Sequence, residues 1–167
     1  MIELCTPISA NEIDMLQIGD MISISGTILT GRDTALPRLV ELIKRKKSLI
    51  NHIDFLGGVM FHTAVSSAGV GPTSSNKPEI EDSIMPLSMA GIRLHLGKGE
   101  IHAETIKSLC RISSVYAVIP PVTALLESKT LQRRVVLFPE LGMEAIHELR
   151  VDHYPAVIAV AHGESVY

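Results

Sequence analysis

Residues 21–43 constrain the fold of this chain more than any other stretch. Residues 21–29 alternate between apolar and mostly small polar side chains, a period of two that predicts a half-buried β-strand. A polar corner follows at 30–33. Apolar residues then return at spacings of three and four, which predicts a helix with Asp33 as its N-cap and Pro37 in its first turn. A strand that turns into an amphipathic helix is typical of α/β folds.

The remaining segments repeat this pattern of apolar strands and helices. Further strands are expected at residues 2–9, 57–64, 92–96, 114–119 and 131–138, and helices at 81–90, 100–111 and 122–129. Gly91 is expected to cap the helix that precedes it. Aromatic residues make up only 4% of the chain and Trp is absent, so Ile, Val, Leu and Met must fill the core. Aliphatic and β-branched runs favour buried strands with helices packed against them.

Three segments are less regular. Residues 11–20 are interpreted as a connection that closes in a Gly19-Asp20 turn. The C-terminal part predicts two strands, 145–151 and 156–161, separated by a break at Tyr154-Pro155, with a helix over 145–149 as an alternative. Residues 162–167 are interpreted as a turn and tail. With 167 residues and 46% apolar content, the chain fits one domain over residues 1–167.

The charge of the chain argues against a nucleic-acid partner. The net charge is −3, whereas nucleic-acid binding calls for a basic face. The basic run at 44–47 ends a predicted helix, where cations complement the helix dipole, and is interpreted as a solvated face. No signal-peptide pattern opens the sequence, and no uncharged apolar stretch reaches the roughly 18 residues that a membrane span needs. We therefore expect a cytoplasmic protein without a membrane partner.

Two cysteines, Cys5 and Cys110, lie far apart and show no metal-ligand spacing. Iron–sulfur clusters normally need three or four thiolates, so this chain is not expected to hold a metal or cluster by itself. Cys110 is expected to face inward beside Ile106 and Leu109 as an ordinary core thiol.

Three predicted strand exits combine glycine with a cation. They carry the segments 30–33, 69–77 and 97–99, with the cations Arg32, Lys77 and Lys98. If these exits share one edge of a sheet, the three cations converge, and such an arrangement makes sense only around an anion. The segment 69–77 adds glycines, peptide N–H groups and the hydroxyls of residues 73–75. The alternative is that 69–77 is a polar surface loop and that Arg32 is a surface charge near a helix cap.

Several known site patterns are missing from these segments. The sequence has no phosphate-binding loop and no Gly-x-Gly-x-x-Gly at a helix start, and the three segments carry no carboxylate pair at helical spacing. Thr73 is a weak base with no imidazole among its neighbours. His62 lies near a strand exit and is interpreted first as a hydrogen-bonded structural group, with a catalytic role as the alternative. The segments supply binding groups more readily than a complete catalyst.

Four ordered motifs together resemble the beta subunit of the iron–sulfur-dependent class I fumarases and L-tartrate dehydratases, a unit that is the C-terminal domain in single-chain enzymes. The motifs lie at residues 25–33, 71–75, 97–99 and 141–146, and the resemblance runs from about Gly19 to the tail. It implies a swivelling β/β/α domain, in which a mixed sheet carries packed helices. It also implies reversible hydration of a dicarboxylic acid, such as fumarate to L-malate, with a [4Fe-4S] cluster held by a partner alpha subunit in a hetero-oligomer.

The resemblance also implies roles for single residues. Arg32 matches a carboxylate-binding arginine, and Lys98 matches the lysine of a Gly-Lys-Gly loop. Thr73 falls on a threonine that takes part in proton abstraction, for which the alpha subunit would supply an acidic partner. Lys77 and Ser74 complete the predicted substrate-binding set.

Two positions depart from the family pattern. Lys77 stands where the family usually has arginine, so a point charge replaces a bidentate fork. Leu36 stands where the family tends to have histidine. The leading hypothesis is a fumarase beta subunit. The alternatives are an L-tartrate dehydratase beta subunit and, from a different class, a stand-alone carboxylate-binding regulatory module.

Overall fold

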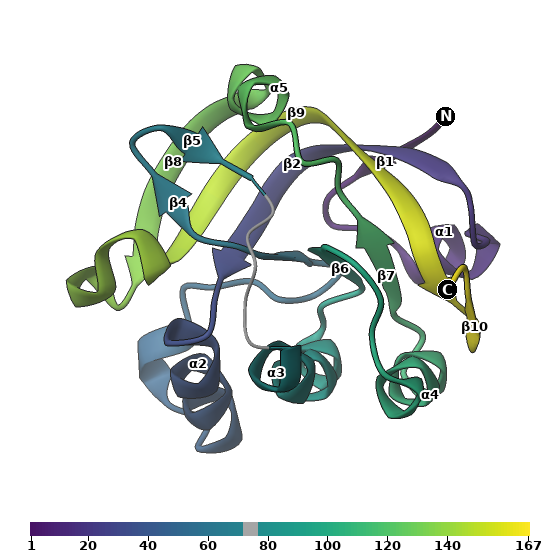
Figure 1. The fold of residues 1–167 in the computed structure, drawn as a ribbon. Coiled ribbons are helices and arrows are strands. Elements are labelled where there is room, and N and C mark those ends of the chain that lie inside the picture. Colours follow the sequence, from purple (N-terminus) through teal and green to yellow (C-terminus); the bar gives the residue numbers. More distant parts are fainter. Residues whose placement is uncertain (72–76) are drawn as a thin grey trace.

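The structure is a computed structural model that describes residues 1–71 and 77–167, apart from the side chains of Lys77 and Glu79. Its centre is a run of short parallel strands, β3 (Val59–His62), β6 (Leu94–Gly97) and β7 (Val115–Val118). Helices α2 (Ala35–Lys44), α3 (Lys77–Ala90) and α4 (Ala103–Arg111) cover one face of these strands (Figure 1).

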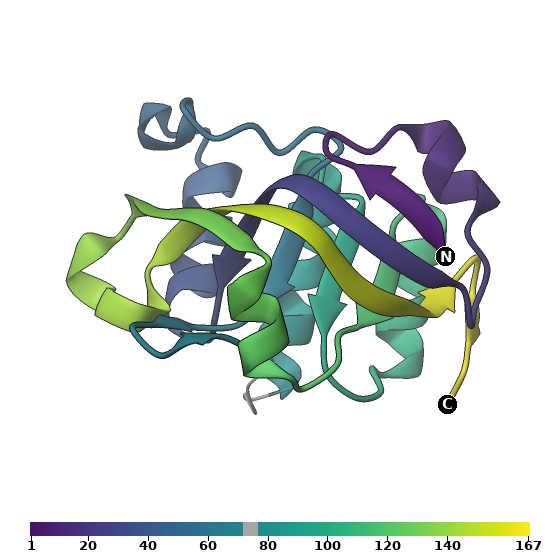
Figure 2. The same ribbon diagram turned by 90° about the horizontal axis from the view of Figure 1, so that it is seen from above.

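Three long strands cover the other face (Figures 1 and 2): β2 (Met21–Gly31), β8 (Thr130–Leu137) and β9 (Ile146–Ala161). Strand β2 pairs in parallel with β3 and antiparallel with β9, while β9 also pairs with β7. The sheet therefore closes on itself through β2, β3, β6, β7 and β9. The expected mixed sheet with packed helices, in a β/β/α arrangement, is confirmed.

Shorter elements complete the described chain. They are β1 (Ile2–Cys5), α1 (Ala10–Met15), the 3-10 helix η1 (Ser48–Ile50), β4 (Val65–Ser66), β5 (Gly69–Val70), α5 (Thr123–Ser128), the 3-10 helix η2 (Pro139–Glu144) and β10 (Glu164–Ser165). Residues 69 and 70 therefore belong to a strand, and the C-terminal turn leads into β10. Both corrections arise from pairing with β4 and β9, respectively.

The core has two main parts because both faces of the central strands are covered. Aliphatic side chains of β2 and alternate residues of β3 and β6 fill the inside of the closed sheet, with Ile24 and Phe61 among the fully buried side chains. The opposite face of β3 packs on the helices, where Met60 belongs to one buried cluster with Leu36 and Leu87. The strand predicted for residues 21–29 is confirmed, but it is not half-buried throughout, because Ser23 and Leu29 are buried as well as the isoleucines.

Helix boundaries follow local chemistry, with two differences from expectation. The N-cap of α2 is Thr34 rather than Asp33, and the Thr34 hydroxyl donates to the Glu144 carboxylate at 3.0 Å instead of capping the helix. Helix α3 begins at residue 77 rather than 81. At its other end Gly91 has φ +130° and donates to the Ser88 carbonyl, as expected for a helix-terminating glycine.

A helix replaces part of the connection expected at residues 11–20. Helix α1 begins with a capping box, in which the Ser9 hydroxyl accepts from the Glu12 N–H and the Glu12 carboxylate accepts from the Ser9 N–H. The Ser-x-x-Glu signal is present in the sequence, so the interpretation of this segment as a connection was wrong.

Cys110 is exposed rather than inward-facing. The buried stripe of α4 consists of Thr105 and Leu109. Cys110 lies about 100° further around the helix axis than Leu109, which turns its thiol out of the core.

The C-terminal part is one strand, β9, rather than two strands or a helix. A bulge absorbs the irregularity: the register against β2 shifts between Val151 and Tyr154, and His153 adopts φ +55°. Pro155 then pairs with β2. The opposite edge of β9 changes partner here, from β8 at Val151 to β7 at Val157, so the missing N–H of the proline costs no ladder bond on that edge.

Candidate active site

The parallel strands β2, β3 and β6 end side by side at one edge of the sheet. Gly31 of β2 is in register with His62 of β3, and Phe61 is in register with Leu96 of β6. The next residues along β2 and β6 are Arg32 and Lys98. Because neighbouring strands lie about 4.8 Å apart, the ends of β2 and β6 are separated by roughly 10 Å, with the end of β3 between them. The structure thus places two of the three predicted cations at one strand-end edge.

Arg32 is held at the corner between β2 and α2. Its carbonyl accepts the N–H groups of Ala35 and Leu36, which start the helix. Its side chain is about one quarter exposed, and Nε lies 3.9 Å from the Glu144 carboxylate. Glu144 belongs to the fourth of the motifs that carry the family resemblance. The first and fourth motifs therefore meet in space through Arg32 and Glu144.

Lys98 is exposed at the end of β6. The Lys98 backbone hydrogen-bonds the hydroxyl of Tyr116, a buried side chain of β7. Burial raises the pKa of Tyr116, so this hydroxyl stays neutral and serves as a fixed partner for the backbone. The Gly-Lys-Gly loop is thereby attached to the neighbouring strand.

The loop predicted to carry Thr73 is fixed where the described chain enters it. The Thr63 hydroxyl, fully buried just after β3, donates to the Gly71 carbonyl at 2.5 Å. The Thr63 N–H donates to the Gly31 carbonyl of β2. Thr73, Ser74 and the Lys77 side chain lie outside the described residues, so their predicted roles stay predictions.

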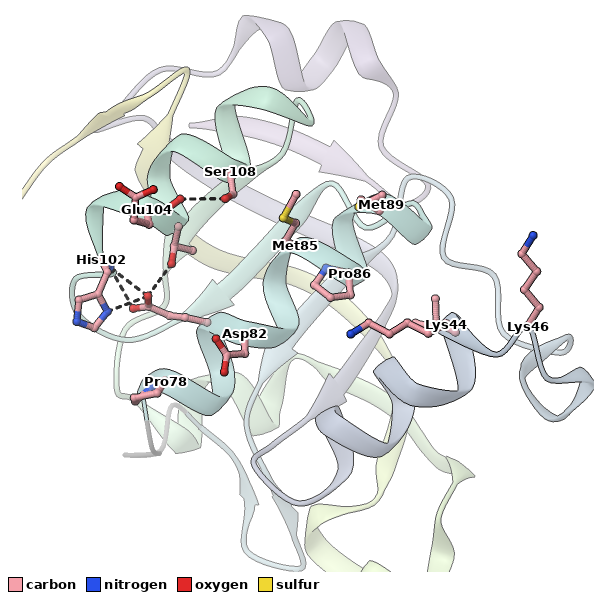
Figure 3. Close-up of a pocket in the computed structure, with 13 residues that line it drawn as sticks. Lys44, Lys46, Pro78, Asp82, Met85, Pro86, Met89, His102, Glu104 and Ser108 are labelled. Carbon is pink, nitrogen blue, oxygen red and sulfur yellow. Dashed lines mark hydrogen bonds and ion pairs between the residues drawn. The ribbon is translucent and has the colours of Figure 1, made fainter.

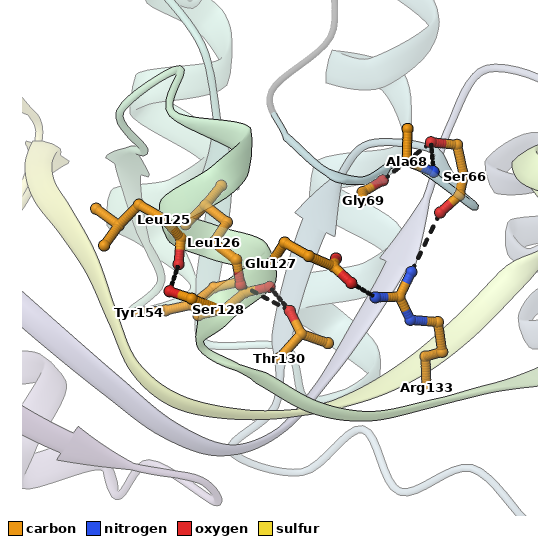
Figure 4. Close-up of polar contacts among 10 residues, drawn as sticks. All are labelled: Ser66, Ala68, Gly69, Leu125, Leu126, Glu127, Ser128, Thr130, Arg133 and Tyr154. Carbon is orange, nitrogen blue, oxygen red and sulfur yellow. Dashed lines mark hydrogen bonds and ion pairs between the residues drawn. The ribbon is translucent and has the colours of Figure 1, made fainter.

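A polar cluster anchors the β4–β5 hairpin that leads to Gly71 (Figure 4). The Arg133 guanidinium donates to the Ser66 carbonyl at 3.1 Å and forms an ion pair with Glu127 of α5. The Ser66 hydroxyl donates to the Gly69 carbonyl, which closes the hairpin. Strand β8 and helix α5 therefore hold the start of the predicted catalytic loop, a role that no local sequence pattern indicates.

Helices α3 and α4 are joined at their N-terminal ends by Glu81. Its carboxylate accepts from the backbone N–H of His102 at 3.1 Å and from the Thr105 hydroxyl at 2.6 Å. A groove of about 760 Å³ runs from this junction along α3 toward the end of α2, and the exposed side chains of Met85 and Met89 line it (Figure 3). Arg32 and Lys98 do not line this groove, so it is distinct from the strand-end edge.

Leu36 is completely buried above Gly31. A methyl group added at Gly31 would lie 2.6 Å from Leu36 Cδ2, so the glycine makes room for this leucine. Position 36, where the family tends to have histidine, therefore holds a leucine that packs between α2 and the end of β2.

Two histidines, His62 and His95, are buried between the sheet and α3. Nε2 of His62 lies 3.0 Å from Nδ1 of His95, and Nε2 of His95 lies 2.7 Å from the Ser88 hydroxyl. Burial lowers the pKa of His62 from 6.5 to about 3, and burial also lowers the pKa of His95. Both imidazoles are therefore neutral near pH 7. The interpretation of His62 as a hydrogen-bonded group agrees with this geometry.

The lowered pKa of His62 predicts a loss of stability in acid. Below pH 6.5 the unfolded chain binds a proton at this histidine and the folded chain does not, so the unfolding free energy falls as the pH drops from 6.5 toward 3. For His62 alone, the loss at pH 5 relative to pH 8 is roughly 2 kcal/mol. Urea unfolding of the full chain at both pH values measures it. His62→Gln should reduce the difference and His52→Gln, at an exposed histidine, should not; equal differences in the two variants would contradict the prediction.

Within residues 1–71 and 77–167 no group of three or more His, Cys, Asp or Glu side chains could hold a metal ion. The two thiols are exposed on different elements, β1 and α4. The described side chains thus do not fit an iron–sulfur cluster, which needs three or four thiolates. A membrane-crossing helix is not found among the described residues either.

Comparison with known proteins agrees with the four motifs. The family model described as the fumarase C-terminus matches residues 1–167. The L(+)-tartrate dehydratase subunit beta of Escherichia coli is 28% identical over 176 residues, which cover 98% of this chain and 85% of that protein. The anaerobic class I fumarate hydratase of the same organism is 27% identical over 156 residues, which cover 89% of this chain and 28% of that enzyme. The aerobic class I fumarate hydratase of Salmonella typhimurium is 26% identical, over 95% of this chain and 29% of that enzyme. Because the family model matches the full length of the chain, the protein belongs to the fumarase C-terminus family.

Proposed function

We propose that this chain is the beta subunit of a hydro-lyase that reversibly hydrates fumarate to L-malate together with an alpha subunit. One observation carries the proposal: in a chain that matches the family over its whole length, the strand register brings Arg32 and Lys98 to one edge of the sheet. Cations gathered at a strand-end edge favour an anionic ligand, and α/β folds commonly bind ligands at this edge. A dicarboxylate satisfies both cations with one molecule.

The chain's own residues would bind and orient the substrate. The planar guanidinium of Arg32 suits one carboxylate, and Lys98 supplies a point charge to the other. Lys77 and Ser74 would complete the binding set from the neighbouring segment. With lysine rather than arginine at position 77, the second carboxylate is held with less angular constraint, which favours a difference in substrate geometry from relatives that carry arginine.

The proton in this proposal is handled by Thr73. A threonine hydroxyl accepts a proton from carbon only when a stronger base takes its own proton in turn. No such base is offered by the loop itself, so an acidic group of the alpha subunit is assigned this role. Hydration and dehydration then use the same groups in opposite directions.

The cluster belongs to the partner in this proposal. The described residues offer no ligand set for a [4Fe-4S] cluster. When bound in the alpha subunit, the cluster supplies Lewis-acid chemistry. The contribution of this chain is to orient the carboxylates, to handle the proton and to exclude water.

A tartrate dehydratase is the second candidate within the same class. It is favoured by the Escherichia coli relative named L(+)-tartrate dehydratase subunit beta, of which the match covers 85%, against 28% of the anaerobic fumarate hydratase. This chain thus corresponds to nearly all of a separate subunit. A stand-alone carboxylate-binding module is the third candidate, from a different functional class.

The proposal is tested by producing the chain with and without its alpha partner under anaerobic conditions. We expect the two chains to co-purify as a hetero-oligomer that forms fumarate from L-malate, and this chain alone to be inactive. Steady-state comparison of L-malate with L-tartrate then separates the two dehydratases. Full activity of the isolated, iron-free chain would contradict the two-subunit proposal, and carboxylate binding without any partner or turnover would favour the regulatory module.

A further inference from the structure

A chain of three buried polar side chains connects helix α3 to the strand-end edge. It runs from Ser88 on α3 through His95 on β6 to His62, the last residue of β3. All three residues are at most 2% exposed. The proposed reaction above gives none of them a role.

Counting the protons on these three side chains shows in which direction the hydrogen bonds are donated. Among the described residues the Ser88 hydroxyl has one hydrogen-bond partner, Nε2 of His95, so its proton is satisfied only by donation to that nitrogen. A neutral His95 that accepts on Nε2 carries its own proton on Nδ1 and donates to Nε2 of His62. A neutral His62 that accepts on Nε2 must then carry its proton on Nδ1. The reverse direction would leave two buried groups unsatisfied, the Ser88 O–H and the His62 lone pair, instead of one.

The geometry of the two imidazole rings suits a hydrogen bond from His95 to His62. The two imidazole planes are 25° apart and their centroids are 5.3 Å apart. For rings joined by a nitrogen–nitrogen contact of 3.0 Å, this centroid separation means that edges meet rather than faces. The N–H of His95 therefore points close to the lone pair of His62, as a good hydrogen bond requires.

The free end of this hydrogen-bonded series belongs to His62, the last residue of β3 at the strand-end edge. Nδ1 of His62 is buried and has no hydrogen-bond partner among the described residues. On either side of His62 the register places a glycine, Gly31 before Arg32 and Gly97 before Lys98. Among β2, β3 and β6, only β3 therefore places a side chain at this level, that of His62. Leu36 packs over Gly31, and the Tyr116 hydroxyl lies beside Gly97.

We propose that Ser88 and His95 are positioning residues that hold His62 in its Nδ1–H form, and that this N–H donates a hydrogen bond to a substrate carboxylate between Arg32 and Lys98. The inference rests on the proposed function. It makes His62 a specificity-determining residue that recognises a carboxylate oxygen by a neutral donor.

A neutral donor fits this location for a physical reason. A third cation between Arg32 and Lys98 would raise the repulsion among the binding groups, whereas an uncharged N–H adds a directed hydrogen bond without added charge. A fixed tautomer also rejects ligands that present a donor at this point, because two N–H groups would then face each other.

The tautomer can be read directly in the full-length wild-type chain labelled with ¹⁵N-histidine. Long-range ¹H–¹⁵N correlation distinguishes a protonated from an unprotonated ring nitrogen. We expect both His62 and His95 to be protonated on Nδ1. Protonation of His62 on Nε2 would overturn the inference, whatever the activity of the assembled enzyme.

Variants test the carboxylate contact in the assembled enzyme. His62→Phe removes the donor and should raise KM for the dicarboxylate about 10- to 100-fold, with a smaller change in kcat. His62→Asn can place an amide N–H near the position of Nδ1 and should recover most of the affinity. An unchanged KM in a folded His62→Phe enzyme would overturn the carboxylate contact even if the tautomer is as expected.

Ser88→Ala tests whether the Ser88 hydroxyl sets the tautomers of the two histidines. Without the donor, His62 should show a mixture of tautomers and KM should rise, by less than in His62→Phe. The matched control is Ser83→Ala, at a buried serine of the same helix whose hydroxyl donates to the Ile80 carbonyl instead. A Ser88→Ala chain with the wild-type tautomers would show that Ser88 does not set them. If the assembled enzyme shows no turnover of any dicarboxylate, the proposed function fails, while the spectra still decide the tautomer.

Discussion

Replacing Arg32 by alanine should lower kcat/KM of the assembled enzyme about 10²- to 10³-fold, mostly through a higher KM. Removing one partner of a desolvated, hydrogen-bonded charge pair costs about 2–5 kcal/mol, because the substrate carboxylate loses its counter-charge. The fold should tolerate the change, since the side chain is partly exposed and its ion-pair contact with Glu144 is long, at 3.9 Å. Steady-state kinetics with thermal unfolding of the same preparation separates these two effects.

Two further variants sharpen the Arg32 prediction. Arg32→Lys keeps the charge but loses the planar fork, so it should recover only part of kcat/KM. Glu144→Gln removes the neighbouring carboxylate and should change kcat/KM by less than about tenfold, since partly exposed ion pairs contribute at most about 1 kcal/mol. Wild-type KM and kcat in Arg32→Ala would rule out the carboxylate role of this residue.

Replacing Thr73 by valine should lower kcat about 10²- to 10⁴-fold and leave KM within a few-fold of wild type. Valine keeps the shape of threonine but has no hydroxyl, and positioned proton transfer typically contributes 10²- to 10⁴-fold to a rate. Because the contribution arises in the transition state, the loss falls on kcat rather than on substrate binding. The measurement is steady-state hydration of fumarate by the assembled enzyme.

Thr73→Ser is the matched control for the proton role. Serine retains the hydroxyl and should keep kcat within about tenfold of wild type. Equal losses in the serine and valine variants would indicate that the methyl group matters rather than the hydroxyl. Turnover at the wild-type rate in Thr73→Val would remove Thr73 from the mechanism.

Local patterns predicted most elements of the fold. The alternation at 21–29 and the apolar spacing at 36–43 each depend on neighbours in the sequence, and both appear in the structure as β2 and α2. Gly91 ends α3 as predicted, because the left-handed conformation it adopts favours glycine. The prediction of two strands in place of β9 was wrong because it depended on residues distant in the sequence. Whether Pro155 interrupts a strand depends on which edge is paired there, and that is decided by β7 and β8.

For the candidate site, too, the sequence predicts one part and the tertiary structure decides the other. The sequence by itself determined the residue types, because Arg32, Lys98 and the segment around Thr73 stand in motifs that can be recognised without coordinates. The placement of Arg32 and Lys98 at one edge depends on strand order and register, which join segments tens of residues apart. Thr63 bound to Gly71, Glu144 beside Arg32 and Arg133 beneath the β4–β5 hairpin are contacts of this kind.

The buried hydrogen bonds among Ser88, His95 and His62 show most clearly what the sequence could not predict. Three residues from a helix and two strands carry no shared pattern in the sequence, and a lone histidine in an apolar strand says nothing about its tautomer. Only the tertiary structure placed the two imidazoles in contact and gave the Ser88 proton one acceptor among the described residues. Hydrogen-bond direction is a property of neighbours in space. The sequence therefore determined the chemistry available to this protein, and the packing of α3 on the sheet decided how two of its histidines are protonated.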